Sequence, residues 1–74
     1  MSVMEVMDQT GHTRHIWDAS NEDEVQAART MYDGLTRKGY RAFHVKKSGE
    51  EGQRMDTFDP DAEKMILVPQ LKGG

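Results

Sequence analysis

The stretch Lys-Met-Ile-Leu-Val-Pro-Gln-Leu-Lys-Gly-Gly, residues 64–74, decides the fold because it joins an unbroken apolar run to a polar end. Four consecutive apolar residues, Met65 to Val68, are typical of a strand that is buried on both faces. Pro69 ends the run, since proline has no N–H to donate to a neighbouring strand. Residues 65–68 are therefore expected to form a central strand, and residues 70–74 a flexible C-terminal tail.

Two strands are predicted at the other end of the chain, at residues 2–8 and 12–18. The turn between them contains Gly11, which can take a positive φ at little cost. Strands joined by so short a turn form an antiparallel hairpin. In the second strand, Arg14 and Ile16 are expected on one face, and His15 and Trp17 on the other.

A helix follows the hairpin. Ser20 or Asn21 is expected to cap it, and the acidic residues 22–24 complement the positive end of the helix dipole. Gly39 is expected to end the helix in a left-handed conformation. One apolar stripe recurs at spacings of three and four residues. Its members are Val25, Ala28, Met31, Tyr32 and Leu35.

The remaining segments predict a third strand at residues 40–46, a fourth at 53–58 and a short helical turn at 59–63. Asp59 would cap this turn, with Pro60 at its first helical position. The expected fold is a small α+β domain over residues 1–69, in the order strand, strand, helix, strand, strand, helical turn and central final strand. The long helix must cover one face of the sheet, because nothing else in the chain can bury that face.

Composition narrows the possible classes of protein. At 74 residues the chain has room for one domain, and the absence of cysteine excludes disulfides, thiolate metal sites and a cysteine nucleophile. The net charge of −3 argues against nucleic acid as the main partner. No apolar run approaches the length of a membrane span, and the start of the chain does not have the pattern of a signal peptide. We therefore expect a cytoplasmic monomer.

The order of elements and the terminal Gly73-Gly74 resemble the β-grasp fold of ubiquitin and its relatives. In that family a central last strand leads into a free tail that ends in Gly-Gly, and a leucine followed by a basic residue precedes the two glycines. The matching residues are Met65 to Val68 for the strand, and Leu71 and Lys72 for the tail. The tail match is short, and the rest of the likeness depends on element order. The second hairpin, residues 41–58, looks longer than that of ubiquitin.

The resemblance implies that Gly74 is the acyl group of a modifier or sulfur carrier. A partner activating enzyme would use ATP to adenylate its carboxylate, which is then passed to a target amine or converted to a thiocarboxylate. Gly73 would form a slender neck, since a tail without side chains can pass through a narrow channel of an activating enzyme or protease. Leu71 and Lys72 would be recognised by these partners. The chain itself would need no cofactor and would not be an enzyme.

The residues disfavour three other kinds of site. His12 and His15 point to opposite faces of a strand, which disfavours a shared metal ion, although His44 could join one of them. Residues 59–70 lack the glycine and glutamate of a calcium loop. A basic cluster near the helix end is more often solvated surface. Its members are Arg37, Lys38, Arg41, Lys46 and Lys47.

Trp17 is a binding anchor if exposed and a core residue if buried, and the core is favoured. The leading hypothesis is the ubiquitin-like modifier or carrier. The alternative is a non-conjugated adaptor or structural module that binds a protein through its sheet face or edge. Deleting Gly73 and Gly74 should abolish the first function and spare the second.

Overall fold

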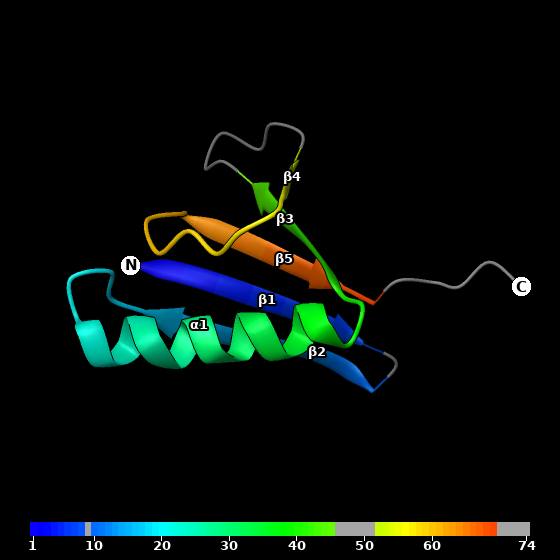
Figure 1. The fold of residues 1–74 in the computed structure, drawn as a ribbon, viewed down its shortest axis with the longest axis horizontal. Coiled ribbons are helices and arrows are strands. Elements are labelled where there is room, and N and C mark those ends of the chain that lie inside the picture. Colours follow the sequence, from blue (N-terminus) through cyan, green and yellow to red (C-terminus); the bar gives the residue numbers. More distant parts are fainter. Residues whose placement is uncertain (9, 46–51, 70–74) are drawn as a thin grey trace, which may run out of the picture.

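The computed structural model describes residues 1–8, 10–45 and 52–69. Within these ranges, five strands and one helix form an α+β fold with a mixed sheet, whose strand order is β2-β1-β5-β3-β4 (Figure 1). The elements in chain order are β1 Ser2–Asp8, β2 Gly11–Trp17, α1 Glu22–Arg37, β3 Arg41–Val45, β4 Gln53–Met55 and β5 Lys64–Val68.

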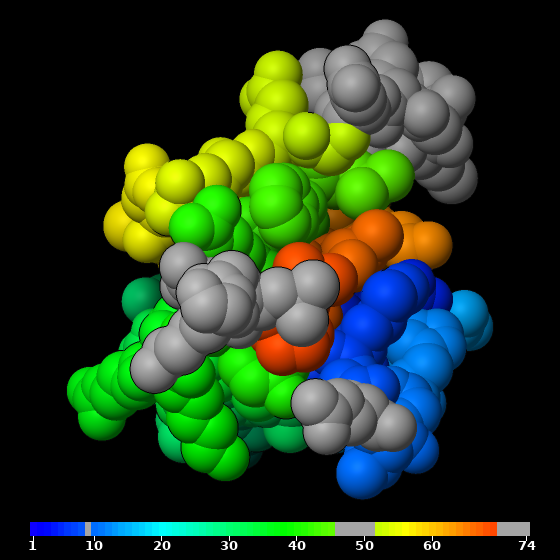
Figure 2. Space-filling model, turned by 90° about the vertical axis from the view of Figure 1, so that its right-hand side faces the viewer, coloured from blue at the N-terminus to red at the C-terminus, as the bar shows by residue number. Residues whose placement is uncertain are grey.

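The last strand occupies the middle of the sheet, as its apolar run predicts. β5 pairs in parallel with β1 on one side and antiparallel with β3 on the other. Figure 2 shows this contact between the two ends of the sequence, with the blue of β1 beside the orange of β5. The sheet is therefore built around the last strand of the described residues.

The predicted hairpin is confirmed, although β2 begins and ends one residue earlier than expected. β1 and β2 pair antiparallel from Ser2 opposite Trp17 to Asp8 opposite Gly11. Gly11 has a φ of 141°, a region that favours glycine. This register fixes which side chains of the two strands share a face.

The helix has the predicted cap and the predicted apolar stripe. Asn21, one of the two expected caps, accepts hydrogen bonds from the backbone N–H groups of Asp23 and Glu24. Gly39, with a φ of 100°, follows the last turn. Ala28 and Tyr32 are buried, and the other members of the stripe are partly buried against the core. Helix α1 thus packs one face onto the sheet and leaves the opposite face to solvent.

The core lies between the sheet, α1 and the segment that joins β4 to β5. The ring of Phe58, from that segment, lies 5.7 Å from Trp17 and 5.5 Å from Tyr32, measured between centroids. The indole N–H of Trp17 and the hydroxyl of Ser2 both donate to the carbonyl of Pro60. These two hydrogen bonds hold the segment against the start of β1 and the end of β2.

Three predictions in this region need correction. β4 covers residues 53–55 instead of 53–58, because Phe58 turns away from the sheet into the core. Residues 59–63 form one turn, closed by a bond from the Ala62 N–H to the Asp59 carbonyl, and no helical turn. The Pro60 carbonyl, which a helix would need internally, is already bonded to Ser2 and Trp17. β3 covers 41–45 instead of 40–46.

β5 is buried on one face only, which corrects the expectation that both would be buried. Met65 and Leu67 are both 0% exposed, whereas Ile66 and Val68 on the other face are only partly buried. The helix of the described residues covers the face of Met65 and Leu67. That helix is too short and too polar to cross a membrane.

Candidate interaction surface

The face of the sheet away from α1 carries a mixture of apolar and cationic side chains. The strand registers place its members, which alternate with core residues along each strand. We call this surface the open face. It consists of Val3, Glu5, Met7, His12, Arg14, Ile16, Arg41, Phe43, Val45, Arg54, Lys64, Ile66 and Val68.

One row of side chains crosses all five strands. Arg14 of β2 is opposite Glu5 of β1, which is opposite Ile66 of β5. Ile66 is opposite Phe43 of β3, and Phe43 is opposite Arg54 of β4. The row therefore has an arginine at each end and an apolar pair, Ile66 and Phe43, with the buried Glu5 between Arg14 and Ile66.

Further apolar side chains extend this pair along the strands. Val3, Val45 and Val68 are partly buried. Ile16 is 58% exposed and Met7 is 40% exposed. Single exposed apolar residues are ordinary, but a cluster drawn from four neighbouring strands is characteristic of a binding surface.

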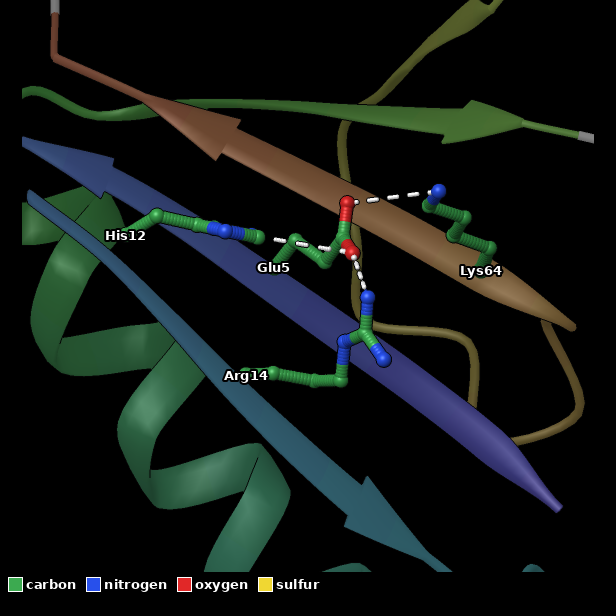
Figure 3. A network of polar contacts seen from close by, with 4 residues as sticks. All are labelled: Glu5, His12, Arg14 and Lys64. Carbon is green, nitrogen blue, oxygen red and sulfur yellow. Dashed lines mark hydrogen bonds and ion pairs between the residues drawn. The ribbon is translucent and has the colours of Figure 1, made fainter.

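Glu5 is the buried charge of the open face. Its side chain is 7% exposed, and its carboxylate lies between cations from two neighbouring strands (Figure 3). Arg14 donates from Nη2 to Oε1 at 3.0 Å, and Lys64 Nζ lies 3.3 Å from Oε2. His12 Nε2 lies 3.6 Å from Oε1. The carboxylate fixes the two long cationic side chains above the sheet.

These contacts keep Glu5 ionised. Burial alone would raise the pKa of this carboxyl, but hydrogen bonds from Lys64 and Arg14, together with the nearby charges of Lys64 and His12, lower it below its ordinary value. A carboxylate with a lowered pKa is a poor proton acceptor at neutral pH. Glu5 is therefore suited to positioning cations and not to general base chemistry.

The open face is cationic although the chain is acidic. Four permanent cations and one carboxylate give it a net charge of about +3 over the described residues, against −3 for the whole chain. The cations are Arg14, Arg41, Arg54 and Lys64. Exposed carboxylates lie elsewhere, for example at the start of α1 and in the turn near Asp59. The cations of the open face and these carboxylates thus come from different elements of the fold.

The open face does not contain a described cluster of metal ligands. Over residues 1–8, 10–45 and 52–69, no three side chains of His, Asp or Glu are arranged to hold a metal ion. His12, on the open face, and His15, on the core side of β2, do not share a face. The open face offers fixed positive charge and apolar area, both of which act by binding.

The predicted tail residues Leu71, Lys72, Gly73 and Gly74 lie outside the described residues. Trp17 is 2% exposed and belongs to the core, so its alternative role as an exposed anchor for a partner is excluded by its burial. Of the residues predicted for function, Trp17 is therefore the one that lies in the described part of the chain, and it is in the core.

The sequence interpretation missed the row from Arg14 to Arg54. One signal was available for its first pair, because a hairpin that closes with Asp8 opposite Gly11 also sets Glu5 opposite Arg14. The other members come from strands that are distant in sequence. Their registers depend on tertiary packing and could not be read from local patterns.

Comparison with protein-family models, with curated proteins and with solved structures found no significant match.

Proposed function

We propose that this chain is a protein-binding module and that the open face is its binding surface. The observation that carries the proposal is the cluster of partly buried and exposed apolar side chains on a sheet face opposite the helix. A sheet normally buries both of its faces or keeps a polar one. An apolar face without a covering layer is stabilised when another molecule covers it.

The apolar residues of the open face are of a kind that favours a protein as the partner. Aliphatic side chains dominate the face, with Ile16 and Ile66 as its largest aliphatic members and Phe43 as its single aromatic residue. Interfaces between proteins combine such an apolar centre with a polar rim that includes arginine. The arginines at the ends of the central row provide that rim.

Site-specific photocrosslinking tests this function. A photoreactive phenylalanine analogue at position 43 would replace a side chain of similar size on the open face, and the same analogue at Gln26 would probe the exposed side of α1. In cells of the source organism, position 43 should give defined protein adducts. Position 26 should give few or none.

Equal adducts at both positions, or none at position 43, would contradict the proposal. A third analogue at position 16 serves as a second probe of the same face, since Ile16 is 58% exposed and should accommodate a larger side chain. Thermal unfolding of each variant shows whether the analogue leaves the fold intact.

A second candidate, the ubiquitin-like modifier or carrier, is favoured by the sheet arrangement. The last strand lies in the middle of a mixed sheet, parallel to the first strand and packed under one helix, which is the arrangement expected of a β-grasp. In this proposal Gly74 is activated by an ATP-dependent partner enzyme and transferred to an amine or to sulfur. The open face would then serve for recognition by the enzymes and receptors of the modifier.

Truncation separates the two candidates. The chain is expressed with an N-terminal tag in the source organism, with and without Gly73 and Gly74, and samples are boiled in denaturant and reductant. Heavier bands that disappear on truncation, with Gly74 joined to a lysine amine by mass spectrometry, support the protein modifier. A thiocarboxylate on Gly74 supports the sulfur carrier. If neither is found and the photocrosslinks persist after truncation, the binding module alone remains.

A further inference from the structure

We infer that the partner of the open face is an acidic protein segment, with an apolar side chain at its centre and carboxylates on both sides. This inference rests on the proposed binding function and adds the chemistry of the ligand. It follows from the central row, in which Ile66 and Phe43 lie between two arginines, Arg14 and Arg54. Glu5, between Arg14 and Ile66, is buried and already bonded to Arg14 and Lys64, so it offers little charge to a partner. A partner that complements the accessible members of the row places an apolar group over its apolar pair and a carboxylate near each arginine.

The spacing of the row limits the length of the segment. Four strand spacings of about 4.8 Å separate Arg14 from Arg54, which gives about 19 Å between their backbones. An extended chain covers that distance in about six residues. The carboxylates of the partner should therefore lie a few residues to either side of its apolar anchor.

The cations differ in how much charge they can offer. Arg14 and Lys64 share the Glu5 carboxylate, at 3.0 and 3.3 Å, so part of their charge is already neutralised. They keep side-chain exposures of 59% and 41% and can still meet a second carboxylate. Arg41 and Arg54 are exposed at the other side of the face, and Glu5 is not close to them in the pairing. Charge reversal at Arg41 and Arg54 therefore probes the partner without removing the Glu5 contacts.

Charge also disfavours two other occupants. A second copy that met the same face would bring two surfaces of about +3 together, which repel. Single-stranded nucleic acid is bound by bases stacking on aromatic side chains, and Phe43 is the one aromatic residue of the described open face. The remaining surface of the chain is acidic and would repel a phosphate backbone.

Selection from a random dodecapeptide display library tests the inference directly. The full chain is the bait, and the double variant Arg41→Glu, Arg54→Glu is used for counter-selection. Enriched peptides should share an apolar residue with Asp or Glu on both sides. One enriched peptide is then synthesised with a fluorophore, and its affinity is measured by anisotropy at low and high salt.

The matched control is the double variant Arg37→Glu, Lys38→Glu, which makes the same change in net charge at the exposed end of α1. We expect the open-face double variant to weaken peptide binding at least tenfold, and the control to change it less than about threefold, because screening limits the reach of exposed charges to about 10 Å. The variant Ile66→Thr, which keeps the charges and removes apolar contact area, should also weaken binding at least tenfold. Circular dichroism confirms that each variant is folded.

Several results would overturn the inference. These are the absence of enriched peptides, peptides without acidic residues, equal effects of the two charge-reversed variants, or tighter binding of a labelled dT12 oligonucleotide than of the peptide. Concentration-dependent dimerisation that is lost in Ile66→Thr would assign the face to a second copy instead. Neutral apolar peptides that bind at position 43 would refute the acidic partner and leave the proposed binding function standing, whereas failed photocrosslinking in cells would refute that function itself.

Discussion

Glu5 is a carboxylate with 7% of its side chain exposed, on a sheet face whose other members are partly or fully accessible. Its burial results from its neighbours, because the long side chains of Arg14 and Lys64 lie over it while their charged groups bond its two oxygens. Such a pair is favourable when one end keeps its hydration, as the cations do here. Glu5 thus connects three strands through side chains, in addition to the backbone ladder.

Replacing Glu5 with Gln should destabilise the fold. The substitution keeps the shape but removes the charge that both cations contact. Hydrogen bonds to charged groups contribute about 1.5–3 kcal/mol, and partial exposure of the cations reduces this, so we expect a loss of about 1 kcal/mol in the free energy of unfolding at pH 7. Urea denaturation measures it. Asp33→Asn, an exposed carboxylate on α1, is the control and should change stability by less than about 0.5 kcal/mol.

The stability difference between the original chain and Glu5→Gln should depend on pH. The pKa of Glu5 is lowered in the folded state, so its contribution is fully present above the unfolded value of 4.5 and is lost as the pH falls through the folded pKa. The difference between the original chain and Glu5→Gln should therefore shrink when denaturation is repeated below pH 4.5. A difference that stays constant down to low pH would show that the charge of Glu5 is not what stabilises the fold.

At the scale of elements, α1 has a well-capped N-terminus and a last turn that is weakened by a glycine. Gly34 lies inside the helix, where a residue without a side chain costs up to about 1 kcal/mol relative to alanine. An added Cβ would meet no atom within 4 Å, either at Gly34 or at Gly39 just beyond the helix. The two glycines differ only in backbone conformation, since Gly39 has a φ of 100°.

Alanine substitutions at these two glycines should therefore have effects of opposite sign. Gly34→Ala should stabilise the chain by about 0.5–1 kcal/mol, because it restricts the unfolded chain and suits the helix. Gly39→Ala should destabilise it by at least about 1 kcal/mol, because its positive φ strains a residue with a Cβ. Thermal denaturation followed by circular dichroism at 222 nm measures both. Two changes of the same sign would mean that the helix does not end as described.

The elements that could be predicted are those with local signals. The hairpin has a glycine turn and alternating strands, and α1 has a cap, an acidic first turn and an apolar stripe. β4 and the turn at residues 59–63 do not have local sequence signals of this kind. Phe58 could have continued β4, but contacts with Trp17 and Tyr32 draw it into the core. Similarly, the pairing of Glu5 with Lys64 depends on the parallel register of β1 and β5, which no local pattern specifies.

At the scale of the whole molecule, the main departure from the sequence interpretation is the half-covered sheet. An unbroken apolar run predicts burial on both faces of β5. In the structure, Met65 and Leu67 on one face are buried, and the other face is only partly buried. One helix of 16 residues covers one face of a sheet, and the described residues hold no second helix for the other. Ile66 and Val68 are therefore apolar residues on a face that no helix of the described residues covers. The binding proposal would account for their apolar character.

Adjacent residues of β5 provide the decisive comparison. Leu67 is 0% exposed, and its replacement by Ala should cost about 3 kcal/mol through lost apolar contacts and a cavity. Because a chain of this size has a total stability of only about 4–11 kcal/mol, that loss is large. Ile66→Ala, a truncation of similar size in the same strand, should cost about 1 kcal/mol, because its side chain is only partly buried. Urea denaturation at a fixed low protein concentration measures both.

The losses of unfolding free energy in Ile66→Ala and Leu67→Ala together test whether the open face is covered in the free chain. If Ile66→Ala costs as much as Leu67→Ala, the open face must be covered in the free chain, by residues outside the described ranges or by a second copy. A loss that falls on dilution would identify the second copy, since dimer stability depends on concentration. A small loss for Ile66→Ala, combined with a large loss of peptide affinity in Ile66→Thr, would instead mean that this apolar residue contributes to binding more than to folding. We expect that combination for a surface that is accessible in the free chain and becomes buried when the partner binds.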